Sequence, residues 1–226
     1  MLSKFNINNC SVMGDSRYDR VMELLNQNNE VKYLKDFKKN KICIVAGSTW
    51  KQDDDLIVEF INSNLSSNTC WVIAPHQINL QYIKELQNKI KLNSILLSEL
   101  NFDNFENINL IIVDSVGILT KLYSYADISY VGGGMGKSGL HNTLEPAVYK
   151  IPVIVGPNFE NFPEVSQLIN LGGIISVNNN QSFKIKIIEL IKSIEQRNKM
   201  GKINLEYIKN NLGASEKVIS YLIEKK

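Results

Sequence analysis

The sequence predicts an α/β protein built on a Rossmann-like, doubly wound parallel sheet. From Lys41 onward, short runs rich in β-branched residues alternate with segments whose apolar residues recur at helical spacing. The short runs are almost entirely apolar, which is typical of strands that helices cover on both faces. Strands of this kind in regular alternation with helices favour a parallel sheet between two helical layers.

Each expected strand is a short, mostly apolar run. In chain order, the strands are expected at residues 41–47, 70–75, 95–98, 109–114, 127–134, 151–156 and 172–177.

Each expected helix is a segment with an apolar stripe of helical period. In the first of them, Leu56, Ile57, Phe60, Ile61 and Leu65 lie on one face. In chain order, helices are expected at residues 53–65, 78–89, 116–124, 142–149 and 162–171, and again from 181 to 225.

Composition excludes several classes of protein. The 226 residues suffice for one large or two small domains, and 44% hydrophobic with 21% charged residues is too apolar for a disordered chain. The net charge of +2 gives no sign of a nucleic-acid partner. No apolar run approaches the roughly 20 residues that span a bilayer, and residues 1–9 lack the apolar core of a signal peptide. The three cysteines, Cys10, Cys43 and Cys70, are expected to be buried, reduced thiols, so we expect a cytoplasmic protein.

Unusual residues gather where the predicted strands end. In an open parallel sheet, ligands bind beyond the carboxyl ends of the strands, where helix N-termini present free N–H groups. Both histidines and most of the glycines fall at that edge. The strand ends are Gly47-Ser48-Thr49, Pro75-His76, Asp114-Ser115-Val116-Gly117, Gly132-Gly133-Gly134 and Gly156-Pro157-Asn158.

The richest of these ends is the stretch VGGGMGKSGLHNTLEPA at residues 131–147. Glycines let backbone amides approach a phosphate closely, and His141 or Asn142 could cap the helix that follows. Glu145, in the first turn of that helix, could accept both hydroxyls of a ribose, and Lys137 could meet an anionic group. The alternative is a glycine-rich connection in which Asn142 is an ordinary cap and Glu145 a surface acid.

Other polar residues are weaker candidates. Three consecutive carboxylates, Asp53, Asp54 and Asp55, point in different directions on a helix, so they favour N-terminal capping over metal binding. Trp50 and Trp71 are expected to pack in the core or at the rim.

Four motifs together resemble the C-terminal domain of the 3-deoxy-D-manno-octulosonic acid (Kdo) transferases. They are G-G-G-x-G-K-x-G-x-H-N-x-L-E-P-A, then K-I-P-V-I-V-G-P-N-F, with A-G-S-T-W at 46–50 and A-P-H at 74–76. Enzymes of this family transfer Kdo from CMP-Kdo to lipid A precursors. They have the GT-B architecture, in which an N-terminal acceptor domain and a C-terminal donor domain are both Rossmann-like.

The resemblance implies a division of the chain. Residues 1–40 would be a remnant of the acceptor domain with the interdomain linker, 41–180 the donor domain, and 181–226 C-terminal helices that are poorly anchored here. In the family, the general base, the lipid A site and the membrane-binding surface lie in the N-terminal half. No catalytic residue is therefore expected in this chain, which would be inactive alone and could need a separate N-terminal half as partner. The complete enzyme would work at the cytoplasmic face of the bacterial inner membrane.

The resemblance also implies roles for individual residues, with no metal or other cofactor. Ser48 and Thr49 would contact the CMP phosphate, and His76 would face the cytidine or the phosphate. The remaining residues implied in donor binding are Gly132, Gly133, Gly134, Lys137, His141, Asn142 and Glu145. One departure concerns His76, because many family members have Pro-Arg-His where this chain has Pro75-His76.

Two other readings of the sequence stay open. A related GT-B enzyme or an epimerase could use a UDP-sugar on the same scaffold. A non-catalytic nucleotide-binding remnant would bind CMP without turnover.

Overall fold

A computed structural model describes residues 10–64, 68–101 and 107–224. Within them, seven strands form one sheet in the order β3-β4-β2-β1-β5-β6-β7, and every neighbouring pair is parallel. The strands are β1 (Ile42–Thr49), β2 (Thr69–Pro75), β3 (Ser94–Leu96), β4 (Leu110–Ile112), β5 (Ile128–Val131), β6 (Val153–Val155) and β7 (Ile174–Ser176). The order reverses direction at β1, so the sheet is doubly wound with its switch point between β1 and β5. This confirms the predicted fold class.

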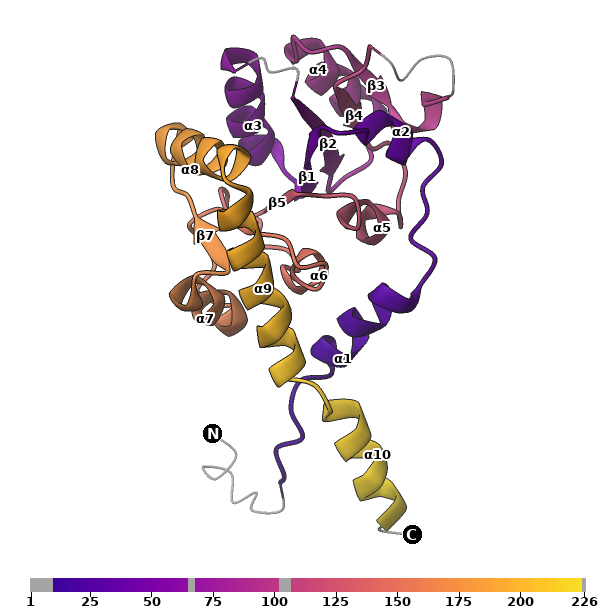
Figure 1. The fold of residues 1–226 in the computed structure, drawn as a ribbon, viewed down its shortest axis with the longest axis vertical. Helices are drawn as coiled ribbons and strands as arrows, with labels where there is room; N and C mark the ends of the chain where they lie inside the picture. Colours follow the sequence, from indigo (N-terminus) through magenta and orange to yellow (C-terminus); the bar gives the residue numbers. More distant parts are fainter. Residues whose placement is uncertain (1–9, 65–67, 102–106, 225–226) are drawn as a thin grey trace.

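Helices connect the strands and cover both faces of the sheet (Figure 1). They are α1 (Ser16–Glu23), α2 (Leu34–Lys38), α3 (Lys51–Ser63), α4 (Leu80–Lys89), α5 (Leu119–Tyr123), α6 (Leu144–Ala147), α7 (Pro163–Leu171), α8 (Asn180–Lys192), α9 (Ile194–Asn210) and α10 (Ala214–Glu224). Two short 3-10 turns, η2 (Leu24–Asn26) and η3 (Leu97–Glu99), complete the described elements. The predicted end of the first helix at residue 65, residues 1–9 and residues 225–226 lie outside the described parts.

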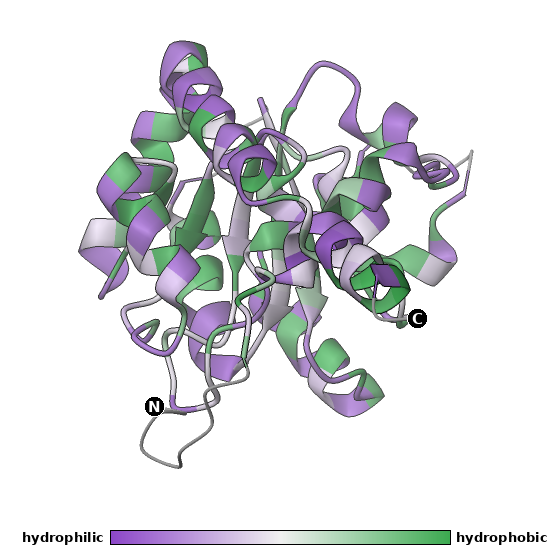
Figure 2. Ribbon diagram, turned by 90° about the horizontal axis from the view of Figure 1, so that it is seen from below, coloured by the Kyte–Doolittle hydropathy of each residue, from purple (hydrophilic) through white to green (hydrophobic). Residues whose placement is uncertain are grey.

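The strands are buried on both faces because alternate residues enter different hydrophobic clusters. In β1, Ile44 faces the cluster formed with α3, α4 and α8, whereas Val45 faces the cluster formed with α2 and α5. A third cluster joins β5 and β6 to α1, α6, α7 and α9. Hydrophobic residues accordingly concentrate on the interior strands, and hydrophilic residues on the outer faces of helices (Figure 2).

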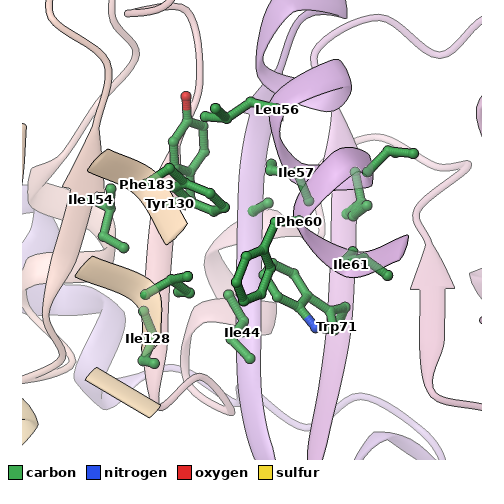
Figure 3. Close-up of a cluster of buried hydrophobic side chains, with 14 of the residues drawn as sticks. Ile44, Leu56, Ile57, Phe60, Ile61, Trp71, Ile128, Tyr130, Ile154 and Phe183 are labelled. Atoms are coloured by element: carbon green, nitrogen blue, oxygen red, sulfur yellow. The ribbon is translucent and has the colours of Figure 1, made fainter. Parts of the chain in front are cut away.

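The tail is better anchored than the sequence suggested. On α8, Phe183, Ile187 and Leu190 are fully buried, and the Phe183 ring meets the rings of Phe60 and Tyr130 at 5.6 and 5.8 Å (Figure 3). On α9, Met200 and Ile208 are buried as well. α10 alone among these three helices buries little: Ala214 is its one buried residue, the N–H of Ser215 donates to Asp19 of α1, and the helix projects away from the sheet (Figure 1).

The expectation that all three cysteines are buried is wrong. The cysteine at position 10 is exposed, whereas Cys43 and Cys70 are buried neighbours on β1 and β2. No helix within the described ranges is long and apolar enough to cross a bilayer.

Candidate nucleotide-sugar site

The predicted site residues gather at the carboxyl edge of the sheet, but they line four separate cavities around its centre. Ser48 and His76 line one of about 140 Å³, and Asn142 and Glu145 another of about 190 Å³. Thr49 lines a third cavity of about 300 Å³, together with Trp50 and Tyr82, and Lys137 a fourth of about 230 Å³. The structure thus brings the residues to one edge without placing all of them in one pocket.

The segment after β5 that runs from Gly132 to Gly139, here called the glycine loop, is shaped by close contacts between backbone segments. A Cβ on Gly132 would lie 2.4 Å from the carbonyl oxygen of Ser48, and one on Gly156 would lie 2.2 Å from the carbonyl carbon of Gly134. Gly133 has a φ of +92°, and its Cβ would lie 2.0 Å from the Gly139 oxygen. These glycines let the loop after β5 pack against the ends of β1 and β6. Their contact with a donor stays a prediction.

Asp53 ties the loop after β1 to this glycine loop. Its fully buried carboxylate accepts hydrogen bonds from the backbone N–H of Trp50 (2.9 Å), the backbone N–H of Gly133 (2.8 Å) and the hydroxyl of Tyr130 (2.6 Å). The bond to Trp50 is the helix-capping role that the sequence predicts. The other two bonds fix the loops on either side of the sheet's switch point against each other.

The aromatic rings of Trp50, His76 and His141 form a stack beside these loops. The rings of Trp50 and His76 are 4.7 Å apart, and those of His76 and His141 are 4.3 Å apart. The indole N–H of Trp50 donates to Nε2 of His141 at 3.0 Å. Burial, and next the neighbouring His76, lower the pKa of His141, so it is neutral at neutral pH.

Ser48 enters its cavity because the end of β1 is irregular. The pairing register of β1 with β2 shifts between Gly47 and Thr49, and Ser48 there has a left-handed φ of +54°. A bulge of this kind redirects a side chain away from the strand's regular alternation. The cavity also contains His76, and its far wall is the loop after β4, at Ser115, Val116 and Gly117.

Asn142 and Glu145 form a connected polar pair. Nδ2 of Asn142 donates to Oε1 of Glu145 at 3.1 Å, and Oδ1 of Asn142 accepts from the N–H of Leu144, the first residue of α6, at 3.0 Å, although the residue at the cap position is Thr143. Burial raises the pKa of Glu145, and the positive charge of Arg20 opposes that shift. Arg17 and Arg20 of α1 line the same cavity, so residues near the start of the described chain contribute to the predicted ribose side.

Sequence reasoning missed three residues of this edge. Trp50 was assigned to packing and Asp53 to capping alone, although each also bonds to the loop after β5. Arg20 gave no signal, because α1 precedes the first strand and nothing in its spacing places it beside Glu145. In the described ranges, no group of three or more His, Cys, Asp or Glu side chains is arranged to hold a metal ion.

Comparison with known proteins gives these residues a family context. No profile of a known protein family matches the chain. A 3-deoxy-D-manno-octulosonic acid transferase of Haemophilus influenzae is 31% identical over 94% of this chain and 51% of its own length. The Rickettsia prowazekii protein of the same name is 26% identical over 93% of this chain and 47% of its own length. The chain therefore spans about half the length of these curated relatives.

Solved structures show the same fold. The C-terminal CMP-Kdo binding domain of WaaA from Acinetobacter baumannii superposes with a TM-score of 0.66 at 18% identity, covering 84% of this chain and 97% of that domain. The UDP-GlcNAc 2-epimerase of Neisseria meningitidis, bound to UDP-GlcNAc, gives a TM-score of 0.63 at 18% identity over 94% of this chain and 54% of its own. At such identities, the likeness extends to the fold alone.

Proposed function

Since this chain is homologous over 94% of its length to 3-deoxy-D-manno-octulosonic acid (Kdo) transferases, we propose that it is the nucleotide-sugar-binding half of such a glycosyltransferase. The donor is CMP-Kdo, and the complete enzyme transfers Kdo to a lipid A precursor in lipopolysaccharide biosynthesis. That reaction takes place at the cytoplasmic face of the bacterial inner membrane. In this proposal, the transfer reaction uses no metal or other cofactor.

The observation that supports the proposal most is the arrangement at the sheet's switch point. Polar groups follow the ends of β1, β2 and β5 there, and α5 lines both neighbouring cavities, with Leu119 in that of Ser48 and Thr120 in that of Glu145. In doubly wound sheets this crevice is where nucleotides bind.

Within this arrangement, each residue has a role that its chemistry suits. The Glu145 carboxylate accepts hydrogen bonds from the ribose hydroxyls, with Asn142 holding its other side. The Ser48 hydroxyl and the two imidazoles meet the phosphate. When CMP leaves, preorganised donors at this edge stabilise the charge that develops on the phosphate. His76 here takes the place of the family's Arg-His pair.

Acceptor activation belongs to a different part of the enzyme. The proposal assigns this chain the donor, and assigns the general base and the lipid acceptor to an N-terminal half. Closure of the two halves would bring the acceptor hydroxyl to the anomeric carbon.

Thermal unfolding with CMP, UDP and ADP side by side tests the proposal. A ligand that binds only the folded state raises its stability by RT ln(1 + [L]/Kd), so the preferred nucleotide gives the largest rise in Tm. We expect a rise with CMP that exceeds those with UDP and ADP. Preference for UDP would contradict the Kdo assignment and favour the alternative of a UDP-sugar enzyme, whose scaffold the epimerase shares. If Tm rises with none of the three nucleotides, the result would favour a remnant that no longer binds a nucleotide.

A further inference from the structure

Trp50 is fixed from two sides at the junction of β1 and α3. Its backbone N–H is bonded to the buried Asp53 carboxylate at 2.9 Å. Its ring lies against the His76 ring, with the centroids 4.7 Å apart and the planes 25° from parallel. The direction of the indole N–H is therefore set by the fold and not by the ligand.

The hydrogen bond from Trp50 determines the protonation state of His141. An indole N–H can only donate, so Nε2 of His141, 3.0 Å away, must carry a lone pair. In a neutral imidazole the proton then sits on Nδ1. His141 Nδ1 has no hydrogen-bond partner within residues 10–64, 68–101 and 107–224, so it is a donor left over for a ligand.

Neighbouring groups act in opposite directions on the protonation of His141. His76 stacks on His141 at 4.3 Å, and two positive imidazoles at that distance would repel each other. Asp53 is the charged group that opposes this by favouring a positive His141, whereas burial and His76 favour the neutral ring. A proton on Nε2 would also break the bond to Trp50.

We infer that Trp50 is a positioning residue of this site: its indole N–H holds His141 as the neutral Nδ1–H imidazole and leaves that N–H for the phosphate of the nucleotide. The part of this inference that concerns the phosphate rests on the proposed function. A partly buried tryptophan at a strand end would otherwise be assigned to packing, and packing alone would be satisfied by any large ring. The N–H distinguishes the two roles.

The free protein gives the first test, without any nucleotide. Long-range ¹H–¹⁵N spectra identify which nitrogen of each imidazole carries the proton, and the wild type is expected to show His141 in the Nδ1–H form. Trp50→Phe keeps a ring against His76 but removes the donor, so His141 should become a mixture of tautomers. Lys51→Gln is the matched control, since Lys51 is the next residue, is exposed and pairs with Asp55. A wild-type His141 protonated on Nε2, or a tautomer unchanged in Trp50→Phe, overturns the inference.

Nucleotide affinity gives the second test. In titration calorimetry, Trp50→Phe should weaken CMP binding about fivefold, because His141 then donates to the phosphate only in the fraction that keeps the Nδ1–H tautomer. In a His141→Gln background, the same substitution should have no further effect, because Trp50 acts through His141. Equal losses in both backgrounds would make Trp50 a packing residue and overturn the inference. A wild type that binds no CMP but shows the Nδ1–H tautomer would instead contradict the proposed function, and would leave the Trp50–His141 bond established.

Discussion

At the scale of single residues, the candidate site depends on carboxylates with different environments. Asp53 is buried with three hydrogen-bond donors, Asp54 is buried with one, and Glu145 is half-buried beside an amide and an arginine. Of these three carboxylates, Glu145 is the one that lines a cavity at the candidate site. The consequences of removing each group should therefore differ in kind.

Glu145→Ala should weaken CMP binding by more than about 1 kcal/mol, the typical loss for a hydrogen bond to a charged group. The reason is that its carboxylate accepts ribose hydroxyls in the proposed complex. Calorimetric titration with CMP measures the effect, and Glu206→Ala on the exposed face of α9 serves as control. An unchanged dissociation constant would remove Glu145 from the site.

Asp54→Asn should change how stability depends on pH. Burial raises the pKa of Asp54 from 3.8 to about 7, while its bond from the Tyr82 hydroxyl opposes the shift. Between these two values the folded protein binds more protons than the unfolded chain, so stability falls as pH rises through that window. Above about pH 7 the loss is complete.

The asparagine variant stays neutral at every pH and can still accept from Tyr82. It should therefore be more stable than the wild type at about pH 8, by a few kcal/mol at most, and similar to it near pH 4. Chemical denaturation across that range measures both, with Asp55→Asn, at an exposed ion pair, as control. Equal pH profiles for wild type and Asp54→Asn would show that Asp54 is ionised in the fold without cost.

At the scale of elements, the close packing of the glycine loop against the end of β6 stabilises the fold independently of any ligand. Gly156→Ala should destabilise the protein by about 2–4 kcal/mol, because its Cβ would overlap the backbone at Gly134. Gly136→Ala lies in the glycine loop itself, where the added Cβ would meet only the flexible Gln52 side chain at 3.2 Å, and should be nearly neutral. Similar unfolding free energies for the two variants would disprove the close approach of the loops.

The tail helix α8 is part of the core, and a second substitution tests that. Phe183→Ala should cost about 3–5 kcal/mol, since its ring fills the space between Phe60 and Tyr130. Ile185→Ala, on the exposed face of the same helix, should cost little. Guanidinium denaturation compares them, and a small loss for Phe183→Ala would mean that α8 is only loosely attached.

Sequence periodicity was sufficient to predict the strands and most of the helices, because buried strands and amphipathic helices have distinct patterns of apolar residues. It did not predict how the tail packs. One helix ends before Ser193, which caps α9, and α8 buries Phe183, Ile187 and Leu190. Contacts between distant segments, such as Trp50 with His141 or Arg20 with Glu145, depend on the packing of whole loops and leave no local pattern.

At the scale of the whole molecule, the proposed function gives the described chain the donor contacts and leaves acceptor activation to another half. The buried carboxylates near the site are engaged by donors, as for Asp53 and Asp54, and Glu145 is assigned to the ribose. A general base has to face the acceptor with a free carboxylate. The chain also spans about half the length of its curated relatives, which fits a division of labour between two halves.

We therefore expect the purified chain to bind CMP but not to transfer Kdo to a lipid A precursor, because binding the donor alone leaves the acceptor hydroxyl neither activated nor oriented. A radiolabel transfer assay with CMP-Kdo and the precursor measures this, and a full-length relative is the positive control. Transfer by the chain alone would place a catalytic base within it and would refute the division into halves. Transfer that appears only when a separately expressed acceptor half is added would show that the missing chemistry resides in that half, and the Glu145→Ala donor half should then restore less activity than the wild type.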